Sequence, residues 1–478
     1  MNYRMIIHIL GYVLILESAC MLLPLACAVI YGEYVAWTFL GCIALCLACG
    51  TLLRCLKVKK HSMYAKEGLV IVSMSWILIS IFGALPFKLS GAIPNLVDAL
   101  FETVSGFTTT GSSILTDIEA LPKSLLFWRS FTHWIGGMGV LVFLMSLVRL
   151  SGGNNIYLLK AESTGPSVGK IVPKIQSSTK ILYGMYSILT VAEMILLIAG
   201  GMKFYDAITI SFGTAGTGGF AILNSSLATY TSYQQNVVTI FMLLFGIDFS
   251  LYYLLLIGKV KEVFRSEELR GYIGIVFLSI ILIWLNISGL YDSIWTALKH
   301  SAFQVATIIT TTGYTTDNFN VWPELSKAIL VILMFIGACA GSTGGGIKVC
   351  RIMILFKSII KELMVTVHPK ITKKITMNGR IVEHETVRTV NVFFAAYLII
   401  FVFALLIISL DNFDFTTNFT AVAATLNNIG PGLNVVGPIG NFSGYSNLSK
   451  IVLSFCMLIG RLEVFPMLIL FSPYTWKK

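Results

Sequence analysis

The sequence FETVSGFTTTG at residues 101–111 aligns without a gap with FQVATIITTTG at residues 303–313. Two further segments, TAGTGGF at residues 214–220 and LNNIGPG at residues 426–432, place related glycines at intervals of roughly 100 residues, too long for a solenoid repeat. Each segment ends a half-apolar stretch that is too short to cross a bilayer. The pattern predicts four equivalent units, each made of a span, a short helix, a glycine-bearing loop and a second span.

The composition indicates a membrane protein. Of 478 residues, 56% are hydrophobic and 12% are charged, whereas soluble domains carry about 25% charged residues. Ten apolar runs have the length of about 20 residues that a helical span needs: 6–30, 35–57, 66–88, 124–148, 181–202, 235–258, 271–289, 326–360, 389–410 and 449–472. We therefore predict an all-α integral membrane fold, which excludes an ordinary soluble enzyme and a disordered chain.

The distribution of basic residues orients these spans. If the N-terminus is cytoplasmic and each short helix returns to the outer side, 26 of the 34 lysines and arginines fall on the cytoplasmic side. Cytoplasmic loops of membrane proteins are enriched in these two residues. Both termini are thus predicted to be cytoplasmic, and the net charge of +11 requires neither an anionic substrate nor a nucleic-acid partner.

The four loops have the composition of a cation site. Irregular backbone at membrane depth is tolerated where protein buries it or where it lines a water-filled path, and the C-terminal ends of short helices favour a cation. The loops carry no carboxylate of the kind that calcium or magnesium prefers, so the ligands are expected to be mainly carbonyl oxygens. The alternative is that these glycines only allow helices to pack. The candidate ion-binding residues are Thr109, Thr110, Gly111, Thr217, Gly218, Thr311, Thr312, Gly313, Asn428, Ile429 and Gly430.

Together with WIGGMG at residues 134–139 and GSTGGGIK at residues 341–348, these loops resemble the Trk/Ktr/HKT superfamily of cation transporters, and most closely its bacterial TrkH branch. The resemblance covers essentially the whole chain and implies potassium uptake across the bacterial inner membrane through a filter with one glycine per unit. A glycine at all four positions implies potassium preference. The implied K⁺ ligands are Thr110, Gly111, Thr217, Gly218, Thr312, Gly313, Ile429 and Gly430.

The resemblance also implies the division of the chain. A two-helix extension before residue 60 is similar to the TrkH branch more than to the Ktr branch. The expected parts are the extension 1–60, unit one at 61–160, unit two at 161–265, unit three at 266–370 with a broken second span, and unit four at 371–478.

A candidate gate lies in the second span of unit three. Residues 341–348 match a nucleotide-binding P-loop only weakly, because Lys348 does not directly follow Gly346 and no Ser or Thr comes after it. Three consecutive glycines disfavour a regular helix. The resemblance implies an intramembrane loop that hinders ion flow, with Arg461 projecting into the pore nearby. The gate candidates are Gly341, Gly344, Gly345, Gly346, Lys348 and Arg461. The alternatives are a packing kink at the glycines and an ion pair of Arg461 with Glu463 or another acid.

The basic stretch from Lys357 to Arg388 predicts contact with anionic lipid of the inner leaflet. The resemblance adds a cytosolic, nucleotide-binding regulatory subunit of the TrkA type and a homodimeric assembly. This chain has no dinucleotide-binding glycine pattern of its own. We therefore expect no cofactor in it apart from bound K⁺, and NAD(H) or ATP/ADP only through the partner.

Acidic residues leave two questions open. Four of them lie in or beside the short helices, where they either raise the cation concentration at the pore mouth or complement helix N-termini: Asp98, Glu102, Asp206 and Asp292. Three others lie in spans and would serve an alternative function, a proton- or sodium-coupled symporter: Asp248, Glu193 and Glu17. A membrane-embedded enzyme is disfavoured because the six histidines are scattered along the chain.

Overall fold

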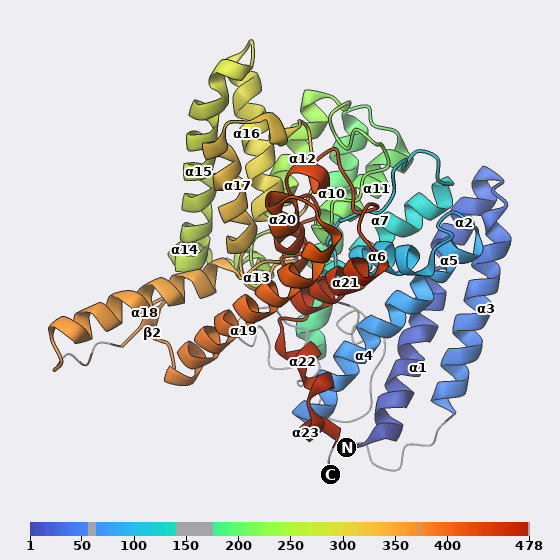
Figure 1. Cartoon of the computed structure of the whole chain (residues 1–478), viewed down its shortest axis with the longest axis horizontal. Coiled ribbons are helices and arrows are strands. Elements are labelled where there is room, and N and C mark those ends of the chain that lie inside the picture. Colours follow the sequence, from blue (N-terminus) through green and yellow to red (C-terminus); the bar gives the residue numbers. More distant parts are fainter. Residues whose placement is uncertain (56–63, 140–174, 371, 373, 477–478) are drawn as a thin grey trace.

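The computed structural model describes residues 1–55, 64–139, 175–370, 372 and 374–476 (Figure 1). This described part is mostly α-helical, as expected. Its strands are β1 (Thr376–Met377) and β2 (Arg380–Ile381), which form one antiparallel hairpin. Residues 140–148 of the predicted span 124–148 and the predicted unit boundaries at residues 60 and 160 lie outside the described residues.

Six helices or helix pairs in the described ranges are long and apolar enough to cross a membrane, or seven if one bent pair counts as a span. The six contain the helices α1 (Tyr3–Cys20) with α2 (Leu22–Tyr31), α3 (Val35–Arg54), α4 (Ala65–Gly83) with α5 (Leu85–Leu89), α10 (Ile175–Ala199), α15 (Glu267–Ile287) with η1 (Ser288–Leu290), and α19 (His384–Ile408) with η3 (Ser409–Asp411). Each coincides with one of the predicted apolar runs, so the chain is a multi-pass membrane protein.

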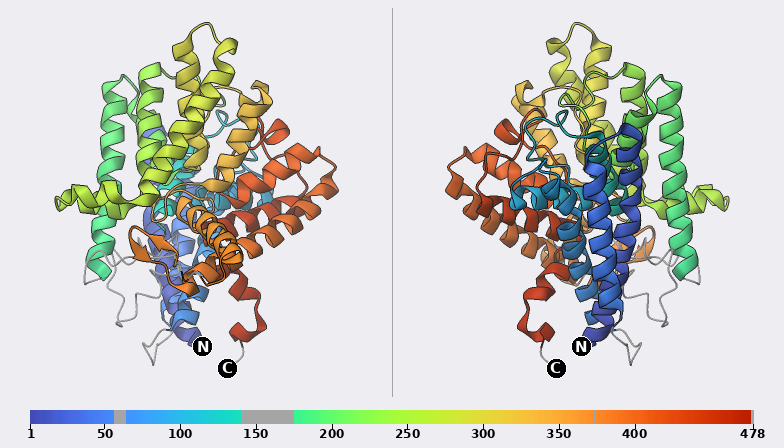
Figure 2. Two further views of the ribbon diagram at one scale, coloured as in Figure 1. Left: turned by 90° about the vertical axis from the view of Figure 1, so that its left-hand side faces the viewer. Right: turned by 90° about the vertical axis from the view of Figure 1, so that its right-hand side faces the viewer.

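The N-terminal extension is a helical hairpin of α1 and α3, seen side by side in Figure 2. The two helices approach closely at Gly11 and Gly50, where a Cβ on either glycine would overlap the backbone carbonyl oxygen of the other. Small residues allow such approach between helices in a membrane. Helix α1 packs on its other side against α4, which joins the extension to the rest of the protein.

Four short helices correspond to the predicted half-apolar segments: α6 (Leu96–Phe107), α11 (Phe204–Gly216), α16 (Ile294–Ile309) and α20 (Phe415–Leu426). Three of them begin at side-chain caps, in which Asn95, Ser293 and Asp414 accept backbone N–H groups of the first turn. With 12 to 16 residues, they are shorter than the roughly 20 residues that cross a bilayer. The C-terminal half of each is almost entirely buried.

The helices that follow the glycine loops are interrupted more often than the sequence predicts. We expected a break only in the run 326–360, but the runs 235–258 and 449–472 are also divided. The helices are α7 (Lys123–Gly137), α12 (Ser232–Phe245) and α13 (Phe249–Leu256), α17 (Glu324–Ile336) and α18 (Val349–Val367), and α21 (Asn447–Arg461) and α22 (Phe465–Phe471). Helices α12 and α13 meet at 91°. Uninterrupted hydropathy was misleading because it records the environment of a segment and not the direction of its axis.

The remaining elements are short: α14 (Val260–Arg265), η2 (Phe319–Val321), η4 (Asn434–Val436) and α23 (Pro473–Trp476). Helix α18 extends away from the other helices, on the left of Figure 1, and leads into the β1–β2 hairpin. The N- and C-termini lie near each other at one end of the molecule in all views (Figures 1 and 2).

Candidate functional site

The loops after α6, α11, α16 and α20 share one backbone conformation. In each, a non-glycine residue has a left-handed backbone, with φ between 54° and 58°: Thr109, Thr217, Thr311 and Asn428. The N–H of the next residue donates to the carbonyl five positions earlier, at 2.8 to 2.9 Å: Thr110 to Ser105, Gly218 to Gly213, Thr312 to Thr307 and Ile429 to Ala424. A glycine with φ of 73° to 103° follows: Gly111, Gly219, Gly313 and Gly430.

This shared conformation corrects the alignment in the second loop. Gly219, not Gly218, occupies the position of Gly111, and Gly218 corresponds to Thr110. The sequence left the choice between two adjacent glycines undetermined. The structure decides the choice through Thr217, which has a left-handed backbone and is the C-cap of α11. Gly219 therefore joins the candidate residues, and Gly218 remains in the loop.

The four loops contact one another in a closed order. A Cβ added to the positive-φ glycine of each loop would lie within 3.0 Å of a carbonyl oxygen in the next loop: Gly111 against Gly218, Gly219 against Thr312, Gly313 against Ile429, and Gly430 against Thr110. These positions tolerate only glycine, both because of φ and because a neighbouring backbone fills the side-chain space. The contacts bring the predicted residues of all four loops together.

Side chains reinforce the loops after α6 and α16 in the same way. The hydroxyl of Thr108 lies 2.8 Å from that of Thr110, and the hydroxyl of Thr310 lies 2.8 Å from that of Thr312. The amide of Asn428 donates to Thr110 Oγ1 at 2.9 Å, which ties the α20 loop to the α6 loop. All these side chains are buried, so the hydrogen bonds form away from lipid and bulk water.

A buried ion pair lies behind the α6 loop. Arg129 Nε donates to Glu102 Oε1 at 2.5 Å, and Arg129 Nη1 donates to the Ala221 carbonyl at 2.9 Å. Glu102 also accepts the Ile114 N–H at 3.0 Å, and only 1% of it is exposed. Both predicted roles of Glu102, at the pore mouth or at a helix N-terminus, are wrong, because it neutralises Arg129 inside the protein. The sequence signal for this ion pair was Arg129 itself, because an arginine within an apolar run usually needs a buried partner.

The other three acids near the short helices differ in exposure. Asp98 accepts a hydrogen bond from Lys450 at 2.6 Å. Asp206 accepts one from the Tyr230 hydroxyl at 3.4 Å, and Asp292 is exposed. Of these three, only Asp292 is exposed, as the prediction that acids raise the cation concentration at the pore mouth assumed.

The loop between α17 and α18 runs from Gly337 to Lys348, longer than the break predicted at Gly341–Gly346. It contacts two of the glycine loops directly. The Gly345 N–H donates to Thr311 Oγ1 at 2.6 Å, and the Gly346 N–H donates to the Asn427 carbonyl at 3.1 Å. Lys348 is buried and its ammonium donates to the Gly344 carbonyl. The loop thus lies against the four-loop cluster.

Arg461, the last residue of α21, connects this loop to α7. Its guanidinium donates to the carbonyls of Thr343 at 2.7 Å, Gly136 at 2.6 Å and Gly137 at 2.5 Å. Glu463, the partner considered from the sequence, forms an ion pair with Arg351. The carbonyls around Arg461 hold a positive charge beside the α17–α18 loop.

One acid holds the same loop and a second lies next to it, and neither was assigned this position from the sequence. Glu268 Oε1 accepts the N–H groups of Ala340 at 2.7 Å and Cys350 at 3.2 Å, at the two sides of the loop. Asp248 caps α13 by accepting the Ser250 N–H at 2.8 Å, next to Gly341. Asp248 is thus explained by the sharp bend before α13. An acid in the first turn of a helix is common, so the sequence offered no specific signal for Glu268.

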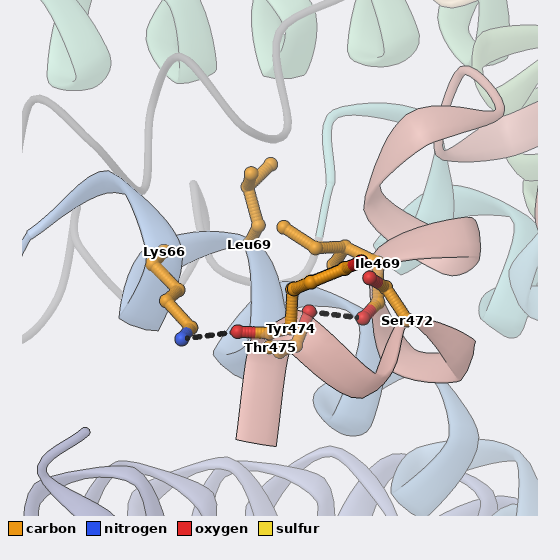
Figure 3. Close-up of a pocket in the computed structure, with 6 residues that line it drawn as sticks. All are labelled: Lys66, Leu69, Ile469, Ser472, Tyr474 and Thr475. Atoms are coloured by element: carbon orange, nitrogen blue, oxygen red, sulfur yellow. Dashed lines mark hydrogen bonds between the residues drawn. The ribbon is translucent and has the colours of Figure 1, made fainter. Parts of the chain in front are cut away.

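A separate pocket lies between the start of α4 and the C-terminal helices (Figure 3). It has a volume of about 360 Å³ and is lined by Lys66, Leu69, Ile469, Ser472, Tyr474 and Thr475. Lys66 Nζ donates to the Tyr474 carbonyl at 3.0 Å. None of its lining residues belongs to the glycine loops, so the pocket is not part of the candidate site.

Comparison with known proteins identifies the family. Residues 38–478 match the family described as TrkH, cation transport protein. The chain belongs to the TrkH family. It is 38% identical to the Trk system potassium uptake protein TrkH of Salmonella typhimurium and 37% identical to that of Escherichia coli, over 100% of both chains in each case. The crystal structure of the potassium transporter TrkH from Vibrio parahaemolyticus, another member of the TrkH family, has a TM-score of 0.90 at 33% identity and covers 100% of both chains.

Proposed function

We propose that this chain is the membrane subunit of a potassium uptake system and that its four glycine loops form the selectivity filter. The observation that carries the proposal is the closed order of contacts, in which each positive-φ glycine faces a carbonyl oxygen of the next loop. We infer that the backbone oxygens of the four loops surround one axis, where they can replace the hydration shell of K⁺. The relatives named above are potassium uptake proteins, which supports K⁺ as the ion.

The proposed K⁺ ligands are oxygens of Thr110, Gly111, Gly218, Gly219, Thr312, Gly313, Ile429 and Gly430; in the second loop the pair moves by one residue from Thr217 and Gly218, because Gly218 corresponds to Thr110 and Gly219 to Gly111. The residues before them, Thr109, Thr217, Thr311 and Asn428, form the left-handed turns at the ends of the short helices. A membrane potential of 100 mV supplies about 2.3 kcal/mol per charge. This drives K⁺ inward without a chemical step, so we propose transport and no enzymatic reaction.

We propose the loop Gly337–Lys348 as the gate. Its hydrogen bonds to Thr311 and Asn427 support a position directly against the filter. Arg461 adds like-charge repulsion toward K⁺, and its bond to the Thr343 carbonyl keeps the loop in place. Gly341, Gly344, Gly345 and Gly346 provide the backbone freedom for movement, and Lys348 ties the end of the loop to Gly344.

We propose four pseudo-equivalent units at 61–160, 161–265, 266–370 and 371–478 around one pore, after the extension 1–60. The shared turn conformation of the four loops supports this division. We place the chain in the bacterial inner membrane with both termini cytoplasmic. Their position at the same end of the molecule supports a common side (Figure 1).

The proposed partners are a second copy of this chain, anionic inner-leaflet lipid at the basic stretch, and a TrkA-type cytosolic subunit that would carry NAD(H) or ATP/ADP. This chain itself would bind only K⁺. A contact that suits such regulation joins the β1–β2 hairpin to α15. The side chain of Glu267 accepts the Asn378 N–H at 2.8 Å and forms an ion pair with Lys357, while the adjacent Glu268 holds the gate loop.

The test is uptake of Rb⁺ by the purified chain in liposomes at a fixed membrane potential, with sodium as competitor. We expect uptake that potassium inhibits strongly and sodium weakly. Uptake that sodium inhibits equally would contradict a potassium filter. Uptake that follows a pH gradient at constant potential would instead favour the proton-coupled symporter considered from the sequence, in which Asp248, Glu193 and Glu17 carry the proton.

A further inference from the structure

One histidine joins two of the glycine loops from behind. His133 lies in α7 and is completely buried. Its Nδ1 is 2.7 Å from the Gly106 carbonyl oxygen at the end of α6, and its Nε2 is 3.2 Å from the Phe220 backbone nitrogen after the α11 loop. A backbone N–H can only donate, so Nε2 is the acceptor and Nδ1 carries the proton. The two bonds thus require one neutral tautomer.

The hydrogen bond from Phe220 sets the direction of a filter carbonyl. The Phe220 nitrogen and the Gly219 carbonyl belong to the same peptide unit, and all described peptide bonds are trans. In a planar trans peptide the N–H and C=O groups point in opposite directions. With its N–H directed at His133, this peptide must direct the Gly219 oxygen away from the imidazole.

The imidazole also occupies side-chain space at Gly218. A Cβ on Gly218 would overlap Cγ, Nδ1 and Cδ2 of the His133 ring, which are the nearest atoms to that position. The φ of Gly218 lies outside the left-handed range, so its conformation alone does not demand glycine. The histidine ring is therefore the physical reason for glycine at this position.

The other loops show what the ring replaces. The positions that correspond to Gly218 are Thr110, Thr312 and Ile429, all with side chains. In two of these loops the threonine hydroxyl pairs with a hydroxyl two residues earlier, Thr108 or Thr310. The α11 loop cannot form this pair, because Gly216 and Gly218 hold the two positions.

We propose that His133 is a positioning residue for selectivity, which orients the α11 loop in place of the side chain that this loop lacks. The inference rests on the proposed filter and adds a residue outside the four loops to it. Without the imidazole, the Gly219–Phe220 peptide loses its partner and can rotate, which removes one oxygen from the path of the ion. Discrimination between K⁺ and Na⁺ should then fall more than the rate of uptake.

The first experiment compares His133→Gln with His133→Phe in Rb⁺ uptake with sodium competition. Glutamine can both donate and accept, so we expect discrimination to stay within about twofold of the unmodified chain, whereas phenylalanine keeps the volume and should lose at least roughly threefold, the factor expected for one net hydrogen bond. Equal discrimination in both variants would overturn the proposal. If neither the unmodified chain nor Arg461→Ala, in which the proposed gate is weakened, takes up Rb⁺, the proposed function fails instead.

The second experiment is a double-mutant cycle. Gly218→Ala alone should lower uptake, because its methyl group meets the ring, and His133→Ala should relieve that defect in the double variant. The matched control is Gly219→Ala, whose methyl group meets the Thr312 carbonyl and should stay defective in both backgrounds. A Gly218→Ala defect that His133→Ala does not reduce would refute the contact as the cause.

Discussion

Arg461→Ala should open the proposed gate in the absence of any partner. The guanidinium donates one hydrogen bond to the gate loop, at the Thr343 carbonyl, and two to the end of α7, at Gly136 and Gly137. A hydrogen bond from a charged group contributes about 1.5 to 3 kcal/mol. If only the bond to Thr343 distinguishes the closed state, its loss shifts the closed–open equilibrium by about 10- to 150-fold. Removal of the positive charge acts in the same direction.

The assay is initial Rb⁺ uptake by the isolated subunit in liposomes at a fixed potential, normalised to folded protein. Arg461→Lys separates the two effects, because it keeps the charge and loses the multiple contacts, so its uptake should lie between those of the unmodified chain and Arg461→Ala. Lys450→Ala is the matched control, since it removes another buried cation of α21 that pairs with Asp98 far along the helix from the gate loop. Unchanged or lower uptake in Arg461→Ala would mean that another element holds the closed state.

Three further predictions test the filter, its support and the gate. Gly111→Ser should weaken discrimination against sodium more than it lowers expression, because a side chain at φ 81° meets the Gly218 carbonyl; equal selectivity would count against the filter. Arg129→Gln should lower the thermal stability of the detergent-solubilised protein by an amount equivalent to about 3 to 5 kcal/mol, since Glu102 is left buried without its ion-pair partner. Adding Glu102→Gln should restore much of this stability, and additive losses would argue against the pair. Glu268→Ala should raise uptake by the isolated subunit, and Glu268→Gln should raise it less, because glutamine still offers an oxygen to the two N–H groups at the sides of the gate loop. Equal uptake by the two variants would exclude Glu268 as a residue that holds the gate loop closed.

Two predictions from the sequence were corrected by the structure, and both concern the direction of the backbone. The runs 235–258 and 449–472 are as apolar as a continuous span, yet they contain the breaks at residues 246–248 and 462–464. In the second loop, Gly218 and Gly219 are equally good glycines by sequence, and only the backbone conformation distinguishes them. At these positions hydropathy and residue type describe how each residue meets its surroundings, and neither specifies the direction of the chain.

The sequence by itself determined the membrane class, the main spans, the short helices and the four loops, because each depends on the local length of an apolar run and on local glycine content. The tertiary structure decided which residues support those loops. Arg129 with Glu102, Glu268 with the gate loop, and His133 with Phe220 are separated by 27 to 87 positions in the chain. Such pairs form only when the helices pack, since a buried polar group must find a hydrogen-bond partner wherever the fold supplies one.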